Sequence, residues 1–130
     1  MKKLLKFSIL FITIISLNLF NVLQKASAIS EVDWLLLKEN DDGKEWVDLG
    51  SIKKINNNEL SVLTKYFQNP SKEKLKGETN LYVMRINCDS REYKDISVNG
   101  IPSFKAKWNT SNDDELIDVV IDKSCNEINS

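Results

Sequence analysis

The sequence predicts an α+β fold in which a small antiparallel β-sheet of about six strands packs against one C-terminal α-helix. Most apolar segments alternate apolar and polar residues with the period of two that a half-buried strand requires. Short turns rich in Asn, Asp and Gly separate these segments. Only the C-terminal segment has the spacing of an amphipathic helix. Together these patterns favour a sheet with one wetter face and one helix-covered face.

The first 28 residues differ from the rest and predict a secretory signal peptide. They open with lysines, continue through the apolar run 7–23 and end in small residues, so we expect cleavage after Ala28. Residues 29–130 would then form one exported domain in the periplasm, on the cell surface or in the medium. The alternative is an uncleaved membrane anchor, because the apolar run is long. Two asparagines within the run disfavour that alternative.

Net charge gives the exported domain no electrostatic reason to bind nucleic acid. The chain has 18 basic and 19 acidic residues, and four basic residues but no acidic ones lie within the first 28. The domain therefore keeps 14 basic against 19 acidic residues, a net charge of minus 5. Nucleic-acid affinity depends on neutralising phosphates with Lys and Arg. We expect no nucleic-acid partner, and no membrane association once the signal is removed.

Five segments carry the strand pattern: residues 32–37, 45–49, 60–67, 81–88 and 101–108. In the fourth, Tyr82, Met84, Ile86 and Cys88 occupy alternate positions and form the apolar set. This register predicts that Cys88 faces the core. Turns are expected at Asp42-Gly43, at 56–58, at 88–91 and at Asn99-Gly100, and a solvated loop at 69–80.

The C-terminal helix is predicted from the apolar stripe Leu116, Ile117, Val120 and Ile121. Asn112 and Glu115 have the spacing of a capping box at its start. Asp114, Asp118 and Asp122 recur every fourth residue and form an acidic ridge. The ridge is either a site for a cation or a basic partner, or the solvated side of an amphipathic helix, and the second interpretation is favoured.

Cys88 and Cys125 are the only cysteines, and both lie in the exported part. Export leads to an oxidising compartment, so the simplest interpretation is one disulfide that closes a loop of 36 intervening residues and pins the helix across the sheet. The alternative is a reactive Cys88 thiol activated by nearby Arg85 and Arg91. No second cysteine stands three positions away, as a redox motif would require.

The chain has no histidine, which removes Ser-His-Asp and Cys-His catalysis and the ordinary zinc sites. We therefore expect no enzyme activity, no cofactor and no metal. Catalysis by carboxylates alone remains the exception, and it would need acidic side chains brought together in a cleft. Instead, candidate residues for binding a partner are found in a basic loop, around the central turn and at one tryptophan: Lys72, Lys74, Lys76, Arg85, Arg91 and Trp46.

A family resemblance rests on Trp34, the segment EWVDLGSIKK at 45–54, the segment YVMRINCDSREYKDIS at 82–97, Trp108, and an acidic helix that ends in Cys125. With these features, the chain resembles the bacterial surface-adhesin protein E family from about Trp34 to Cys125. The resemblance implies a sheet and helix joined by a Cys88–Cys125 disulfide. It also implies a non-enzymatic binding domain for a protein or cell-surface ligand, able to form a homodimer.

In that family, the named relative binds host extracellular-matrix and serum proteins, but no binding motif of that adhesin matches residues here. The alternatives to a binding domain are a small periplasmic enzyme inhibitor or enzyme, and a structural protein of the envelope. An enzyme would place two carboxylates in a deep pocket, whereas a binding domain would expose an aromatic patch on a sheet.

Overall fold

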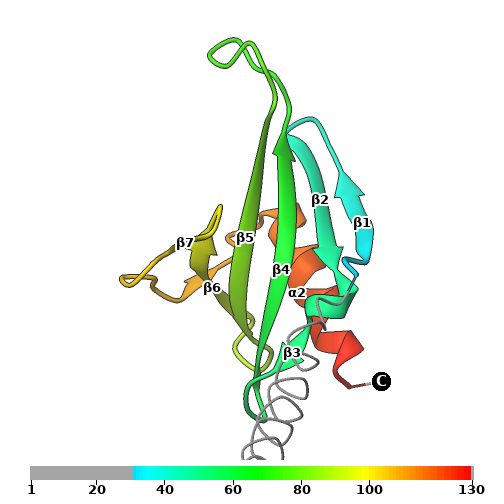
Figure 1. Cartoon of the computed structure of the whole chain (residues 1–130), viewed down its shortest axis with the longest axis vertical. Helices are drawn as coiled ribbons and strands as arrows, with labels where there is room; N and C mark the ends of the chain where they lie inside the picture. Colours follow the sequence, from blue (N-terminus) through cyan, green and yellow to red (C-terminus); the bar gives the residue numbers. More distant parts are fainter. Residues whose placement is uncertain (1–30, 130) are drawn as a thin grey trace, which may run out of the picture. The chain divides into compact units, whose positions relative to one another are not determined.

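The computed structural model describes residues 31–129, so the signal peptide expected at residues 1–28 and its cleavage site lie outside the described residues. Figure 1 shows one sheet with one α-helix against it. The elements in chain order are β1 (Trp34–Glu39), β2 (Gly43–Asp48), the short 3-10 helix η2 (Leu49–Ser51), β3 (Lys53–Lys54), β4 (Glu59–Gln68), β5 (Glu78–Asn87), β6 (Glu92–Val98), β7 (Ile101–Pro102), β8 (Asn109–Thr110) and α2 (Glu115–Glu127).

The sheet is antiparallel throughout, in the order β1-β2-β4-β5-β6-β7. Short β3 pairs with β4, and short β8 pairs with β6. The prediction of an antiparallel sheet with one C-terminal helix is confirmed. The described residues form eight strands rather than about six because three two-residue strands extend the main ones.

One face of the sheet packs against α2 and holds the core. The buried apolar side chains of the cluster are Val47, Leu60, Val62, Met84, Ile86, Val120 and Ile121. Alternate residues along β4 and β5 supply most of the sheet side, as the period-two pattern predicted. Val120 and Ile121 come from the predicted helical stripe, and Leu116 from the same stripe is also buried. The strand predicted at 81–88 is confirmed in register, since Met84 and Ile86 are buried in this core. Its bounds differ: β5 begins at Glu78, within the loop predicted at 69–80, and Cys88 begins the following turn.

The predicted strand at 101–108 is wrong. Only Ile101–Pro102 and Asn109–Thr110 pair with β6, and the residues between them leave the sheet. Pro102 has no N–H with which to continue a ladder, which favours an early end to the strand. Consequently Phe104, which alternation would have placed among core aromatics, is 94% exposed.

The predicted capping box is also wrong. The N-cap of α2 is Asp114, whose Oδ1 accepts hydrogen bonds from the amides of Leu116 at 2.9 Å and Ile117 at 3.4 Å. Asn112 lies before the cap with a φ of 50°, and its Oδ1 accepts from the Thr110 hydroxyl. An N-cap residue has an extended backbone, which Asp114 has with φ −73° and ψ 103°, whereas Asn112 lies in the left-handed region.

Candidate functional site

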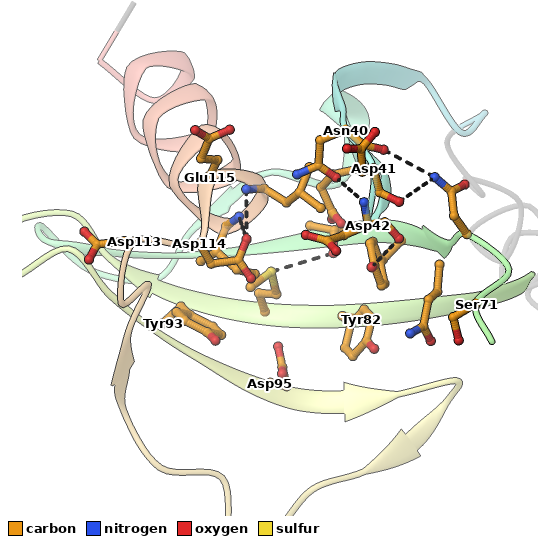
Figure 2. A pocket seen from close by; sticks show the side chains of 18 of the residues that line it. Asn40, Asp41, Asp42, Ser71, Tyr82, Tyr93, Asp95, Asp113, Asp114 and Glu115 are labelled. Atoms are coloured by element: carbon orange, nitrogen blue, oxygen red, sulfur yellow. Dashed lines mark hydrogen bonds between the residues drawn. The ribbon is translucent and has the colours of Figure 1, made fainter. Parts of the chain in front are cut away.

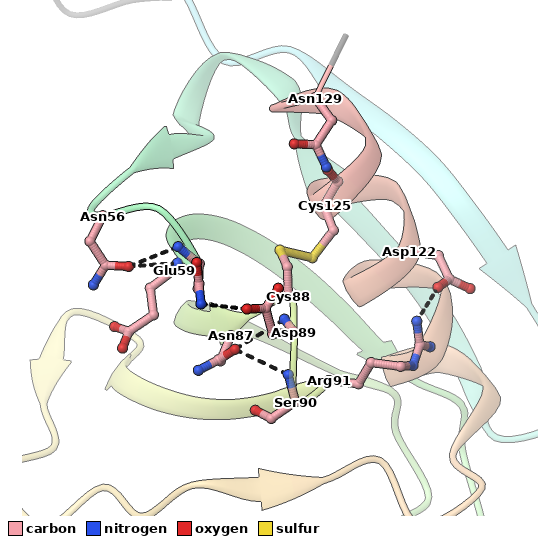
Figure 3. The surroundings of a disulfide bond; sticks show 11 residues. Asn56, Glu59, Asn87, Cys88, Asp89, Ser90, Arg91, Asp122, Cys125 and Asn129 are labelled. Atoms are coloured by element: carbon pink, nitrogen blue, oxygen red, sulfur yellow. Dashed lines mark hydrogen bonds and ion pairs between the residues drawn. A yellow bond between two sulfur atoms is a disulfide. The ribbon is translucent and has the colours of Figure 1, made fainter.

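The disulfide between Cys88 and Cys125 is formed, with the two Cα atoms 5.7 Å apart. It joins the turn between β5 and β6 to the last turns of α2 (Figure 3). Asn87 organises that turn, because its Oδ1 accepts from the amides of Asp89 and Ser90. The bond leaves no free thiol among the described residues. Cys88 is therefore structural, and the reactive-thiol alternative is wrong.

Arg91 connects the same turn to the helix a second time. Its guanidinium lies 2.6 Å from a carboxylate oxygen of Asp122 and 3.5 Å from one of Asp118. In the acidic ridge, Asp118 and Asp122 therefore pair with Arg91 of the same chain. The third ridge residue, Asp114, caps the helix. No group of three or more acidic or cysteine side chains within residues 31–129 is placed to hold a metal ion.

The other basic candidates lie apart from Arg91. Arg85, on β5, pairs with Glu59 of β4 at 2.6 Å. Lys74 pairs with Glu78 at 2.8 Å in the loop between β4 and β5, where Lys72 and Lys76 are exposed. The lysines thus share one loop, but the structure does not bring them together with the arginines. Their role in binding remains a prediction.

Trp46 lies on the side of the sheet that faces away from α2. Residues that pair in register on neighbouring strands share a face of the sheet. This side is therefore defined by four such pairs: Leu36–Trp46, Trp46–Lys65, Lys65–Leu81 and Leu63–Val83. We call it the outer face: Trp34, Leu36, Trp46, Leu63, Lys65, Leu81 and Val83. The Lys65 ammonium lies 4.6 Å from the ring centre of Trp34 and 4.4 Å from that of Trp46.

The outer face keeps apolar area in contact with solvent. Leu36 is 47% exposed and Leu81 is 39% exposed, and no α-helix within residues 31–129 lies on this side. Lys65 orders the two indoles through cation–π contacts, each worth about 0.5–1 kcal/mol at such a site. The result is a pre-ordered aromatic and aliphatic surface of the kind that a partner protein covers.

The opposite side of the sheet contains a cavity because α2 is shorter than the strands it covers. Ten-residue strands such as β4 and β5 span about 33 Å. The 13 residues of α2 span about 20 Å. The disulfide fixes the C-terminal part of α2 at the β5–β6 turn, so the far ends of the strands extend beyond the helix N-terminus. A cavity of about 730 Å³ occupies this uncovered part of the face (Figure 2).

The lining of the cavity is acidic and aromatic. Its carboxylates are Asp41, Asp42, Glu45, Asp95, Asp113, Asp114 and Glu115, and its tyrosines are Tyr66, Tyr82 and Tyr93. No lysine or arginine lines it. Among residues 31–129, two lysines contact lining residues: Lys38 binds Glu115 at 2.5 Å, and the Lys74 ammonium lies 3.4 Å from the Gln68 side chain. The cavity is therefore a site of strongly negative potential with aromatic walls.

Among the carboxylates that line the cavity, Glu45 and Asp95 are the two whose pKa is raised by burial. Glu45 is only 3% exposed. The pKa of Glu45 is raised to about 8, mainly by burial. The Thr64 hydrogen bond lowers the pKa, whereas the charges of Asp114 and Asp95 add to the increase. Burial also raises the pKa of Asp95, whose Oδ1 atom is buried and has no hydrogen-bond partner. Asp95 points into the cavity in the close view (Figure 2), and Glu45 also lines the cavity.

A β-bulge helps to aim Asp95. The register of β5 and β6 shifts between Val83 and Met84, so that Met84 pairs with Asp95 while Val83 pairs with Ser97. The extra residue lets Asp95 share the inward face with Met84 without disturbing the pairing beyond it. The same device is common beside functional sites.

A family model described as the surface adhesin-E family matches residues 35–130. The chain belongs to the surface adhesin-E family. No curated protein and no solved structure matches the chain. The adhesin-E match contains β2 to β8 and α2, and hence both the cavity and nearly all of the outer face. Membership indicates an adhesin-like surface protein. In the described part of this adhesin-E chain, no helix has the length and hydropathy needed to cross a bilayer.

Sequence reasoning missed the cavity of this adhesin-E domain. The signal that could have found it is a change along the inward positions of β4, from Leu60 and Val62 to Thr64 and Tyr66. The same change occurs from Val47 to Glu45 in β2. Inward residues become polar where the helix stops covering them. The alternation of residues along a strand shows which face of the sheet each side chain is on, but it does not show where the helix stops covering that face.

Proposed function

We propose that the protein is an exported, non-enzymatic binding domain that holds a protein partner against its outer face. The observation that carries this proposal is the arrangement of Trp34, Lys65 and Trp46, an ordered aromatic stack on a sheet face without a covering α-helix within residues 31–129. Tryptophan is one of the residue types most enriched in binding hot spots, which cluster near the centre of an interface. Family membership as a surface adhesin supports the same use.

The disulfide supports a rigid binding scaffold. It fixes α2 behind the sheet, so the strands that carry the outer face do not have to order when a partner binds. Preorganisation of this kind reduces the entropy lost on association. The exported location that we propose, whether periplasm, cell surface or medium, agrees with a surface-adhesin domain that carries a disulfide.

The proposal is tested by binding of the oxidised protein to a panel of immobilised proteins: extracellular-matrix proteins, serum proteins and envelope proteins of the producing cell. We expect at least one saturable interaction. Trp46→Ala should weaken it about 30-fold, because truncating a central tryptophan removes about 2 kcal/mol or more of binding free energy.

Phe104→Ala is the matched control, since it also truncates an exposed aromatic side chain but lies on the loop beside β7. It should leave the affinity within about twofold of the unmodified protein. If Phe104→Ala abolished binding while Trp46→Ala preserved it, the binding surface would be that loop and the assignment to the outer face would be wrong.

A second candidate function is carboxylate-based hydrolysis, because Glu45 and Asp95 meet in one cavity. Glycoside hydrolysis uses such a pair, with one acid protonated and the other ionised. Burial raises the pKa of both Glu45 and Asp95, which disfavours a pair with one protonated and one ionised member. We expect no hydrolysis of a panel of nitrophenyl glycosides, and turnover that disappears in Glu45→Gln would contradict the non-enzymatic proposal.

A further inference from the structure

The cavity beside the helix N-terminus is unrelated to the outer face and lies on the other side of the sheet. Three features limit what it can hold: its volume of about 730 Å³, its carboxylates and its tyrosines. A volume of this order accommodates a side chain or a small molecule. The absence of lysine and arginine from the lining rules out an anion as the preferred ligand.

The helix N-terminus does not offset this negative lining. Its first free amides, those of Leu116 and Ile117, already donate to the Asp114 carboxylate. They are therefore not available to a phosphate or carboxylate ligand. Asp114 also balances the partial positive charge that a helix carries at this end.

An independent sign of a missing partner is the state of the buried oxygens. Asp95 lines the cavity, and its Oδ1 atom is buried and accepts no hydrogen bond. Glu45, which is 3% exposed, also lines the cavity and has a side-chain hydrogen bond with Thr64. Buried carboxylate oxygens normally accept hydrogen bonds, so Asp95 lacks a donor that a ligand would supply.

The lining favours an organic cation over a metal ion. Within residues 31–129 the acids do not converge in any group of three that could coordinate a metal. Tyr66, Tyr82 and Tyr93 add aromatic faces, which attract ammonium and guanidinium groups. Such cations also carry the hydrogen-bond donor that Asp95 lacks.

We propose that this cavity binds an alkylammonium or guanidinium cation, with Asp95 and Glu45 accepting its hydrogen bonds and the tyrosines surrounding its stem. The cation is the end of a lysine or arginine side chain of a partner or a free amine of the same chemistry. The assignment does not depend on the partner of the outer face, so either proposal can fail without the other.

Binding of the cation should release a proton from Glu45. The groups that interact with Glu45 are the Thr64 hydroxyl on β4, Asp95 on β6 and Asp114 at the cap of α2. The hydroxyls of Tyr66, its strand partner on β4, and Tyr82 on β5 also interact with its charge. Lys38 on β1 is the other strand partner of Glu45, but the Lys38 ammonium binds Glu115. Burial therefore keeps Glu45 protonated at neutral pH, and a bound cation favours the ionised form.

The test is titration of the oxidised exported protein with the peptide acetyl-Gly-Lys-Gly-amide, with its norleucine analogue and with 1,5-diaminopentane, followed by NMR chemical shifts. We expect the lysine peptide to bind and the uncharged norleucine peptide not to bind. Tighter binding of the peptide than of diaminopentane identifies a side chain as the natural ligand; the reverse identifies a free amine. Equal binding of lysine and norleucine peptides would overturn the proposal.

Asp95→Asn keeps the shape of the side chain and removes its charge, and it should weaken lysine-peptide binding at least about tenfold. Glu127→Gln makes the same kind of change at an exposed helix position that pairs with Lys123, and it should have no effect. Equal affinities for the two variants would contradict the site.

The pH dependence keeps the proposal testable if Asp95→Asn does not fold. In the unmodified protein, affinity for the lysine peptide should rise between about pH 6 and about pH 9 as Glu45 ionises more readily. Glu45→Gln should lose this dependence. An affinity that stays constant over this range in the unmodified protein would exclude Glu45 from the site.

Discussion

Among single residues, Glu45 and Cys88 show what alternation in a strand does and does not reveal. Cys88 continues the inward set of Met84 and Ile86, so its position at the core was predictable from spacing alone. Glu45 also occupies an inward position, two residues from Val47, but its raised pKa results first from burial in the assembled fold and then from the charges of Asp114 and Asp95. No local pattern contains those contacts.

Glu45 should make the domain less stable as pH rises. Its pKa is about 8 in the folded protein and near 4.5 in the unfolded chain. Between these values the folded form holds a proton that the unfolded form has lost, so the free energy of unfolding falls with increasing pH. From about pH 5 to about pH 9 the loss should be about 4 kcal/mol, measured by urea unfolding with the disulfide intact.

Glu45→Gln should remove most of that loss, because a glutamine does not titrate. Burial raises the pKa of Asp95 as well, so a smaller decrease of the same sign should remain in this variant. Glu127→Gln, at an exposed position, should retain the full decrease. A flat stability profile in the unmodified protein would show that Glu45 is ionised in the fold.

At the level of elements, the length of α2 and the place where it is attached determine the site. The strands, the helix and the Cys88–Cys125 bond were predictable from period, turn residues and the oxidising compartment. The cavity was not, because it arises from the difference in length between α2 and the strands β4 and β5. The prediction of a strand at 101–108 was wrong because the alternation of apolar and polar residues does not reveal that the chain leaves β6 after Pro102.

Removing the disulfide should weaken the attachment of α2. Cys88→Ser combined with Cys125→Ser opens a link across a sequence separation of 37 residues. Loop-closure entropy predicts a loss of about 3–4 kcal/mol in the free energy of unfolding. Calorimetry or urea unfolding of the variant and of the oxidised protein measures it.

The Arg91 ion pairs should not replace the disulfide in that variant, because Arg91, Asp118 and Asp122 are all substantially exposed. Arg91→Ala in the oxidised protein should therefore cost less than about 1 kcal/mol. A larger loss than that of the double cysteine variant would make the ion pairs, rather than the disulfide, the main attachment of α2.

For the whole molecule, the sheet separates two surfaces of different chemistry. The outer face presents aromatic and aliphatic side chains around Lys65, and the cavity on the helix side presents carboxylates and tyrosines. The family and the fold class could be inferred from the sequence, and both are confirmed. Which surface meets a partner depends on which parts of the sheet the helix covers, and this is a property of the assembled fold.

The most direct test of the central claim is site-specific photo-crosslinking in cells that export the protein. A benzoylphenylalanine replaces Leu36, which is 47% exposed on the outer face, and in a parallel strain it replaces Glu127 on α2. We predict that the probe at position 36 captures one specific protein and that the probe at position 127 does not. Capture of the same protein from position 127 alone, with none from position 36, would contradict binding through the outer face.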